Sequence, residues 1–225
     1  MLEYLEILKE VFINESRYWY LVEGLGFSIA TTALSALIGI ALGILIALMQ
    51  LSTWRVLSKL AFAYVYIIRG TPVVVQLMIW ANIVFVGALR DMPILLIAAI
   101  AFGINSGAYV AEIIRAGIAG LDKGQMEAAR ALGMGYALSM KEIIIPQAIK
   151  RILPPLVSEF IALLKETSIV GFIGGVDLLR AANIITSQTY RAIEPLLAVG
   201  IIYLILTSIF AMLMRKVEKR LKEGD

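Results

Sequence analysis

Several charged and amide side chains lie inside apolar stretches of this sequence, where ionisable groups are costly and usually face a cavity or a partner. Glu159 could accept a positively charged group, and Asn105 and Gln76 could supply neutral hydrogen bonds. Lys165 could contact a solute or pair with Glu166 or Glu159 instead. Histidine and cysteine are absent, which excludes thiolate nucleophiles, histidine acid–base catalysis and the usual zinc and haem ligands. These residues suit reversible binding of a polar solute, and a purely structural role stays open for each of them.

A break in an apolar stretch at 69–72 is a second place where a solute could bind. Its sequence is Arg69-Gly70-Thr71-Pro72. Proline removes a backbone donor and disfavours a helical residue before it. The backbone groups released at Gly70 and Thr71 can then line a binding site, as at the broken helices of transporters. Arg69 could serve as an ion-pair anchor beside the break.

Membrane-spanning helices must hold these residues, because the composition provides too little polar surface for a soluble domain. Hydrophobic residues make up 60% of the 225 residues and charged ones only 16%, against about 45–50% and about 25% in soluble proteins. The mean hydropathy is +0.89. We therefore expect an all-α, polytopic membrane protein with a single transmembrane domain over 1–225. The net charge of +3 is interpreted as a topology signal, and no nucleic-acid partner is expected.

A helix needs about 20 mainly apolar residues to cross a lipid bilayer. By this criterion the predicted spans are 24–49, 56–87, 92–114, 152–172 and 195–214. The second is too long for one straight helix, so we predict a first helix at 56–68, the break at 69–72 and a completing span from 72 to 87. In the first span, Gly39 and Gly43 form a small-xxx-small pair that allows close helix packing, although incidental lipid-facing glycine fits equally well.

The basic residues predict the orientation of the chain. Lys and Arg are concentrated in the 50–59 loop, in the stretch 115–151 and in the tail after Met214. The positive-inside rule places 115–151 and the C-terminus in the cytoplasm and the N-terminus outside. Residues 1–23 are rich in glutamate and carry leucines about one helical turn apart. We predict an amphipathic helix on the outer membrane interface there, rather than a cleaved signal peptide.

The long predicted cytoplasmic loop, 117–146, contains a short helix. Asp122 is a candidate N-cap, residues 123–132 favour a helix apart from Gly124, and Gly133 can end it in a left-handed conformation. A helix too short and too polar to span a membrane suits docking into a groove on a soluble partner. A re-entrant or surface helix without a partner is the alternative.

One ordered set of residues in this loop resembles the EAA motif of ABC-importer permease subunits. Its members are Glu127, Ala128, Ala129, Gly133, Ile143, Ile145 and Pro146. Further segments look like the polar amino-acid branch of that family, of histidine, arginine and glutamine type. They are Arg69-Gly70-Thr71-Pro72, Gly107-Ala108-Tyr109, Ala111-Glu112-Ile113, Lys123-Gly124-Gln125, Pro146-Gln147-Ala148, Leu153-Pro154-Pro155-Leu156 and Leu163-Leu164-Lys165-Glu166-Thr167-Ser168. The resemblance covers about residues 20–215, and Ile145 and Ser158 stand where leucine and asparagine are usual.

The resemblance implies the type I permease fold, with five core transmembrane helices and a cytoplasmic coupling helix. It also implies a multi-pass protein in the cytoplasmic (inner) membrane of a prokaryote. The expected partners are ABC ATPase subunits, an extracytoplasmic amino-acid-binding protein, and a second permease subunit that is an identical copy or a close paralogue. The chain has no Gly-x-x-x-x-Gly-Lys-Ser/Thr phosphate loop. It therefore cannot be the subunit that hydrolyses ATP. We expect no enzyme activity, cofactor or metal site in this chain, and the resemblance implies that the partner ATPase binds ATP and Mg.

Two sets of residues are expected to carry the function. The ATPase-coupling set is Asp122, Lys123, Gly124, Gln125, Glu127, Ala128, Ala129 and Gly133. The candidate substrate-binding set is Glu159, Asn105, Gln76, Thr71, Gly70 and Lys165. Glu159 would complement a basic amino acid such as arginine, lysine or histidine, which we favour over glutamine. The expected function is a permease that couples ATPase closure to alternating access; a stand-alone secondary amino-acid transporter and a non-transporting scaffold are the alternatives.

Overall fold

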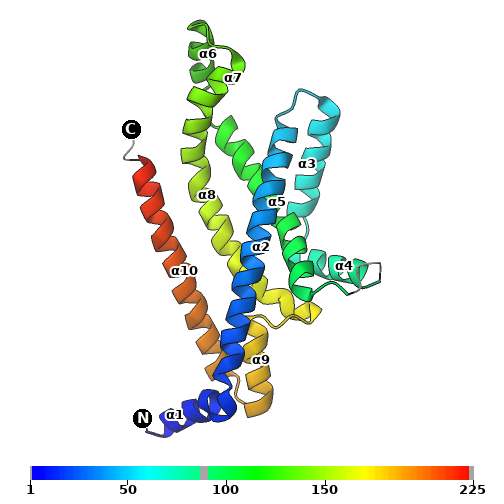
Figure 1. Ribbon diagram of the computed structural model, residues 1–225, viewed down its shortest axis with the longest axis vertical. Coiled ribbons are helices and arrows are strands. Elements are labelled where there is room, and N and C mark those ends of the chain that lie inside the picture. Colours follow the sequence, from blue (N-terminus) through cyan, green and yellow to red (C-terminus); the bar gives the residue numbers. More distant parts are fainter. Residues whose placement is uncertain (1, 87–90, 223–225) are drawn as a thin grey trace.

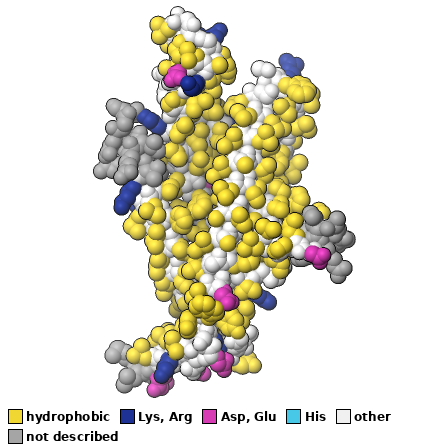
Figure 2. All heavy atoms as spheres, viewed as in Figure 1, with side chains coloured by type: hydrophobic (Ala, Val, Ile, Leu, Met, Phe, Trp, Pro, Cys, Tyr) yellow, Lys and Arg dark blue, Asp and Glu magenta, His cyan; other side chains and the backbone are white. Residues whose placement is uncertain are grey.

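The computed structural model describes residues 2–86 and 91–222 (Figure 1). Every regular element in these ranges is a helix, as the composition predicts. The four longest helices of the described residues extend along the long axis of the molecule. They are α2 (Tyr18–Gln50), α5 (Ile94–Ala119), α8 (Ile145–Glu166) and α10 (Ile193–Lys222). Hydrophobic side chains cover most of the visible surface of this bundle, and charged side chains gather mainly toward its two ends (Figure 2).

Helices α2 and α5 form the centre of the bundle and pack closely because small residues line their contact. A Cβ atom added to Gly39 would lie 2.9 Å from Ser106 Cβ, and one added to Gly43 would lie 2.5 Å from Val110 Cβ. Both glycines are buried. The predicted close-packing role of this pair is therefore confirmed, and the lipid-facing alternative is wrong.

Within the described ranges, α2, α5 and α10 are long and apolar enough to cross a membrane, and the bent pair α3 (Arg55–Arg69) and α4 (Val73–Val86) is a further candidate. Length and composition alone do not mark α8 as a span, because charged residues recur along it. This helix starts before the predicted span 152–172 and ends before residue 172. The helix begins at Ile145, since Pro146 fits its first turn and a π-helical turn leads directly into it.

Helix α4 does not continue the direction of α3. The two helices meet at 105°, and α4 lies across the bundle (Figure 1). The predicted break at 69–72 is confirmed, but the described part of 72–87 is not a straight completion of the same crossing; residue 87 lies outside the described residues. Thr71 Oγ1 donates to the Ile67 carbonyl at 3.0 Å and closes the end of α3. The Pro72 carbonyl accepts from the Gln76 N–H at 3.2 Å and starts α4 in its new direction.

The end of the molecule opposite α3 contains a helix that was not expected from the sequence, α9 (Leu178–Thr189). Its buried face consists of Leu178, Ala181, Ala182 and Ile185. Asp177 caps its first turn by accepting from the Arg180 N–H at 2.8 Å. This apolar spacing of i, i+3, i+4 and i+7 after an aspartate is the signal that could have revealed the helix.

The helix predicted for 1–23 is shorter in the structure and ends at Ile13. The segment 2–17 folds as α1 (Leu2–Leu8), a π-helical turn (Lys9–Ile13) and a 3-10 turn (Asn14–Ser16). Helix α2 then begins at Tyr18, inside the range predicted for the interfacial helix. Long-range apolar contact explains the difference, because Val11 is fully buried in a cluster with Leu178 of α9.

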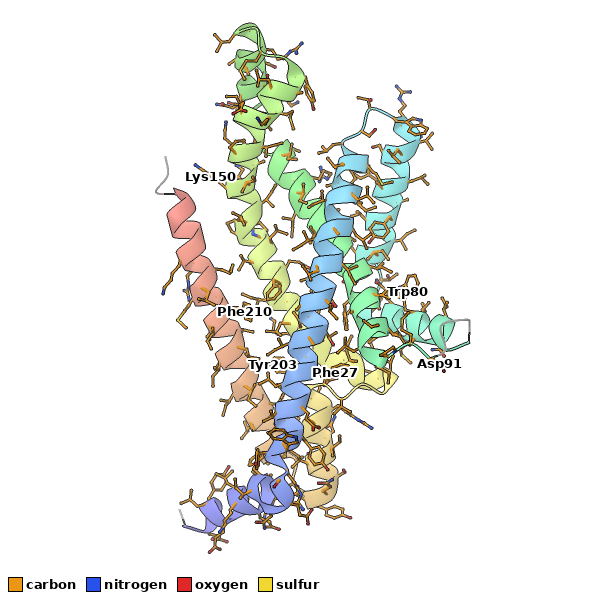
Figure 3. The ribbon with its side chains drawn as sticks, viewed as in Figure 1. Phe27, Trp80, Asp91, Lys150, Tyr203 and Phe210 are labelled. Carbon is orange, nitrogen blue, oxygen red and sulfur yellow. The ribbon has the colours of Figure 1, made fainter. Side chains whose placement is uncertain are left out.

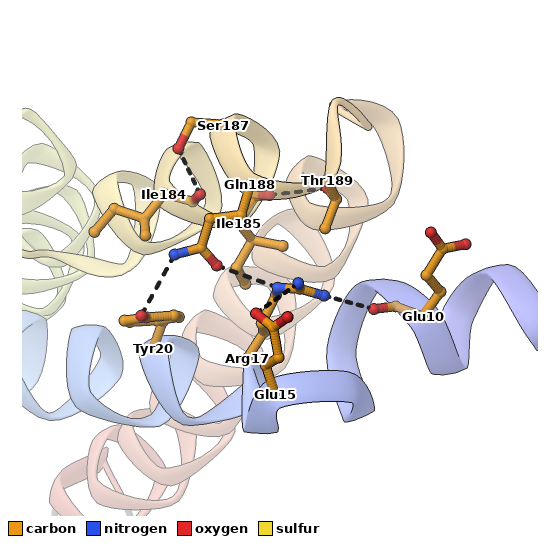
Figure 4. A network of polar contacts seen from close by, with 9 residues as sticks. All are labelled: Glu10, Glu15, Arg17, Tyr20, Ile184, Ile185, Ser187, Gln188 and Thr189. Atoms are coloured by element: carbon orange, nitrogen blue, oxygen red, sulfur yellow. Dashed lines mark hydrogen bonds and ion pairs between the residues drawn. The ribbon is translucent and has the colours of Figure 1, made fainter.

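Arg17 ties this N-terminal segment to α9 (Figure 4). Its guanidinium donates to Gln188 Oε1 at 3.1 Å and to the Glu10 carbonyl at 2.8 Å. It also donates to Glu15 Oε2 at 2.8 Å. Glu15 and Ser16 both have a φ of 55°, in the left-handed region that most residues avoid. The Arg17 network therefore holds a tight turn at the start of α2.

Candidate functional site

A tip formed by residues 120–139 projects beyond the other helices at one end of the molecule (Figure 1). It contains α6 (Lys123–Ala131) and the single turn α7 (Tyr136–Ser139). Asp122 caps α6 as predicted, because its Oδ1 accepts from the Gly124 N–H at 2.9 Å. A π-helical turn, Met140–Ile144, joins the tip to α8.

Gly133 ends the tip's first helix in the left-handed region, with a φ of +85°. Its N–H donates to the Arg130 carbonyl at 3.0 Å, and the Met134 N–H donates to the Ala129 carbonyl at 3.1 Å. A Cβ atom on Gly133 would meet no atom within 4 Å. The chain needs glycine here for its backbone conformation rather than for space.

The residues predicted for coupling lie mostly on the surface of the tip. The exposed ones are Asp122, Lys123, Gly124, Gln125, Glu127, Ala128 and Gly133. Ala129 is only 4% exposed and packs α6 against the rest of the tip. Within the described part of the chain, Glu127 makes no hydrogen bond or ion pair, so its carboxylate is available to a partner.

Two exposed apolar residues of the tip, Tyr136 and Leu138, were not singled out from the sequence. They are 65% and 50% exposed, and Leu132 beside Gly133 is 84% exposed. Their signal in the sequence is a group of large apolar side chains around the glycines of a polar loop. Several exposed apolar side chains on one projecting tip are typical of a protein-binding surface.

The tip is attached to α8 by side-chain hydrogen bonds. Arg151 donates to the Gly120 carbonyl, and Gln147 Nε2 donates to Gln125 Oε1 at 3.2 Å. Both donors lie on α8, so these bonds fix the position of the tip relative to that helix.

Three of the residues predicted to bind substrate meet inside the bundle. Gln76 Nε2 donates to Thr71 Oγ1 at 2.7 Å and to the Ile68 carbonyl at 2.8 Å. Gln76 Oε1 accepts from Asn105 Nδ2 at 3.0 Å. Gln76 and Asn105 are 7% and 3% exposed. Because these groups bond to each other and to the end of α3, their geometry favours a structural role in holding the α3–α4 break.

Glu159 lies half-buried on α8, where Ser106 Oγ of α5 donates to its Oε1 at 2.9 Å. Lys165 is exposed, and within the described part of the chain no hydrogen bond or ion pair joins it to Glu159. The structure therefore brings Ser106 rather than Lys165 to Glu159, and Ser106 was not among the predicted site residues.

A polar groove of about 480 Å³ opens beside the α3–α4 break. It is lined by Phe62, Val65, Tyr66, Arg69, Gly70, Tyr109, Glu112 and Arg115. The Arg69 guanidinium lies 5.1 Å from the centre of the Tyr109 ring, a cation–π contact in place of the predicted ion pair. Arg115 pairs with Glu112 at 2.5 Å. Gly70 is the residue of the predicted substrate set that lies on this groove.

Comparison of the sequence with known proteins identifies the family of this chain. The family described as "Binding-protein-dependent transport system inner membrane component" matches residues 39–223. The chain belongs to this family. The matched range includes the tip, the polar groove and Glu159, so both candidate sites of the permease lie within the part that defines the family.

Individual relatives share most of the permease's length. It is 42% identical to the arginine transport system permease protein ArtQ of Bacillus subtilis (strain 168), over 92% of this chain and 94% of the relative. It is 39% identical to the putative glutamine transport system permease protein GlnP of Rickettsia bellii (strain RML369-C), over 90% of this chain and 93% of the relative. A solved amino acid ABC transporter with histidines shares 44% identity and a TM-score of 0.85, over 93% of this chain and 98% of that one. The permease therefore has the type I ABC-importer fold, which is the fold class predicted from the sequence.

Proposed function

We propose that this permease is the membrane subunit of an ATP-driven importer of polar amino acids, with a basic amino acid as the preferred substrate. Two relatives are named as arginine and putative glutamine permeases, and the solved relative is described as an amino acid transporter with histidines. Glu159 supports the basic preference, because a half-buried carboxylate complements a cationic side chain better than a neutral amide.

The exposed tip is the observation that carries the proposed coupling mechanism. Leu132, which follows α6, and Tyr136, which begins α7, are 84% and 65% exposed, and a projecting helical tip with such side chains suits a groove on a soluble partner. The tip docks into a cleft of the ATPase subunit, which binds ATP and Mg. When two ATPases close on ATP, the tips move with them. The hydrogen bonds of Arg151 and Gln147 transmit this movement to α8, and the permease alternates between inward-open and outward-open states.

The proposed orientation places the tip in the cytoplasm and the α1–α9 end outside. Exposed basic residues at the tip end support it through the positive-inside rule. They include Arg55, Lys59, Lys123, Arg130 and Lys141. An extracytoplasmic binding protein then delivers the amino acid at the α1–α9 end. A second permease subunit, either an identical copy or a close paralogue, faces the polar groove and completes the path.

The candidate substrate residues have different proposed roles. Glu159 accepts the cationic group, and Gly70 lines the path at the polar groove. Gln76, Asn105 and Thr71 hold the α3–α4 break in shape rather than contacting the substrate. Lys165 remains a candidate donor to the substrate carboxylate, since its side chain is exposed.

Co-purification with the ATPase tests the proposed docking. Leu132→Asp in the full-length permease should lose the ATPase, because a charge on the exposed apolar surface cannot enter an apolar groove without a partner. Ala131→Ser, an adjacent exposed position, is the matched control and should retain it. Retention of the ATPase by Leu132→Asp would contradict docking through the tip. Capture of no ATPase by the unchanged chain would favour a secondary transporter or a scaffold.

A further inference from the structure

An apolar groove of about 280 Å³ lies between α2, α8 and α10. Its lining comes chiefly from Leu153, Val157 and Phe160 of α8 and from Phe210 and Met214 of α10. The rings of Phe160 and Phe210 lie 5.0 Å apart, and Phe210 lies on the side of α10 that faces α8 (Figure 3). This surface has no role in the proposed coupling or in the proposed substrate path.

Helix geometry places the apolar groove on the opposite side of α8 from the polar surface. Arg151 and Pro155 line a cavity that shares Glu112 with the polar groove, whereas Leu153 and Val157 line the apolar groove. Residues two apart in an α-helix are separated by about 200° around its axis. The polar side suits the solute and a second permease, so the apolar side is the one that faces the acyl chains of the bilayer.

Positive charge flanks the end of the apolar groove nearer the tip. Arg215 and Lys216 directly follow Met214 on α10, and both are exposed. Lys and Arg immediately cytoplasmic of a transmembrane helix attract anionic lipid headgroups. The apolar groove therefore ends beside Arg215 and Lys216, two cations that can bind a headgroup phosphate.

We propose that the apolar groove binds an acyl chain of an anionic phospholipid, whose headgroup phosphate lies against Arg215 and Lys216. The acyl chain fills the groove that is lined by side chains of α2, α8 and α10. It therefore joins the helix that carries Glu159 and the tip to the last helix of the permease. The proposal rests on the proposed orientation of the chain but not on its substrate or its ATPase.

Native mass spectrometry of the purified full transporter tests the site, after titration with phosphatidylglycerol or phosphatidylcholine. We expect phosphatidylglycerol to be retained in preference. Arg215→Gln with Lys216→Gln should weaken it about fivefold per charge removed, or about 1 kcal/mol each. Arg215→Lys with Lys216→Arg keeps both charges and should bind normally. Arg55→Gln with Lys59→Gln is the matched control, because these exposed cations lie at the same end but on α3. Glycerol 3-phosphate, which has no acyl chain, should not compete.

Four results would overturn the proposal. Equal retention of the two lipids would show that the headgroup charge is not recognised. Equal losses in the α10 and α3 variants would show a general surface effect. Competition by glycerol 3-phosphate would show that the groove plays no part. If the α10 variant instead separates two permease subunits, the groove is an interface with a second copy. Thermal unfolding of each variant checks that the fold is retained.

Discussion

Ser106 on α5 and Glu159 on α8 are joined by a hydrogen bond of 2.9 Å from Ser106 Oγ to Glu159 Oε1. The bond fixes one carboxylate oxygen, while Oε2 makes no hydrogen bond within the described part of the chain. A carboxylate held in this way can accept a cation without first being reoriented. The same bond connects the central helix of the bundle to the helix that the tip would move.

Glu159→Gln should separate charge recognition from packing, because the glutamine Oε1 can still accept from Ser106. We expect uptake of arginine or lysine to fall roughly tenfold or more, the loss of a charge-assisted contact of about 1.5–3 kcal/mol. Uptake of glutamine should change little. Transport into proteoliposomes that contain the complete importer measures both. An equal fall for all substrates would assign Glu159 a structural role.

Gly133→Val should impair coupling, because a β-branched residue at a φ of +85° costs about 1–3 kcal/mol of local strain. We expect lower substrate-stimulated ATP hydrolysis while the bundle still folds. Gly133→Asn should keep more activity, since asparagine tolerates the left-handed region. Gly135→Ala is the control, with a φ of −65° and open space around an added Cβ. Normal coupling in Gly133→Val would argue against a required tip geometry.

Gly43→Ala should destabilise the bundle, because the new Cβ would lie 2.5 Å from Val110 Cβ. Overpacking of this kind costs about 1–3 kcal/mol. Gly26→Ala on the same helix meets no atom within 4 Å and should be neutral or slightly stabilising, since alanine favours a helix over glycine by about 1 kcal/mol. Thermal unfolding in detergent compares the two. Similar melting temperatures would mean that α2 and α5 can separate at little cost.

Asp177 should make stability depend on pH. Its carboxylate accepts from the Gly171 and Arg180 N–H groups, each at 2.8 Å. Burial raises the pKa of the Asp177 carboxyl above its ordinary value, although these backbone hydrogen bonds oppose the shift. A raised folded-state pKa means that its contribution to stability is greatest below the unfolded pKa, about 3.9, and declines as pH rises through the folded value.

Asp177→Asn removes this titration and keeps one acceptor oxygen. The melting temperature of the unchanged permease should therefore fall, relative to the Asn variant, as the pH rises from about 4 toward neutrality. Parallel melting curves across that range would contradict the expected titration. Asp91→Asn, at an exposed aspartate, controls for general effects of charge.

Local signals in the sequence predicted the features whose causes are local. The Asp122 cap, the left-handed Gly133 and the break at Pro72 each follow from one residue and its immediate neighbours. The direction of α4 after that break depends on Gln76 reaching back to Ile68 and across to Asn105, which no periodic pattern records. The contact between Ser106 and Glu159 spans 53 positions. The fold of residues 2–17 likewise depends on contacts with α9. The amphipathic pattern indicated the helix that runs from Leu2 to Ile13, but it gave neither the end of that helix nor the turn before α2.

The bond from Arg17 to Gln188 joins positions 171 residues apart, and this has a consequence during synthesis. At about 5–20 residues per second, roughly 10–30 s separate the emergence of the two partners from the ribosome. During that interval Val11 and Arg17 lack their contacts with α9. A nascent chain that stops before Gln188 contains α2, α5 and α8, but it lacks the side chain that accepts the hydrogen bond from Arg17 at the α1–α9 end of the molecule.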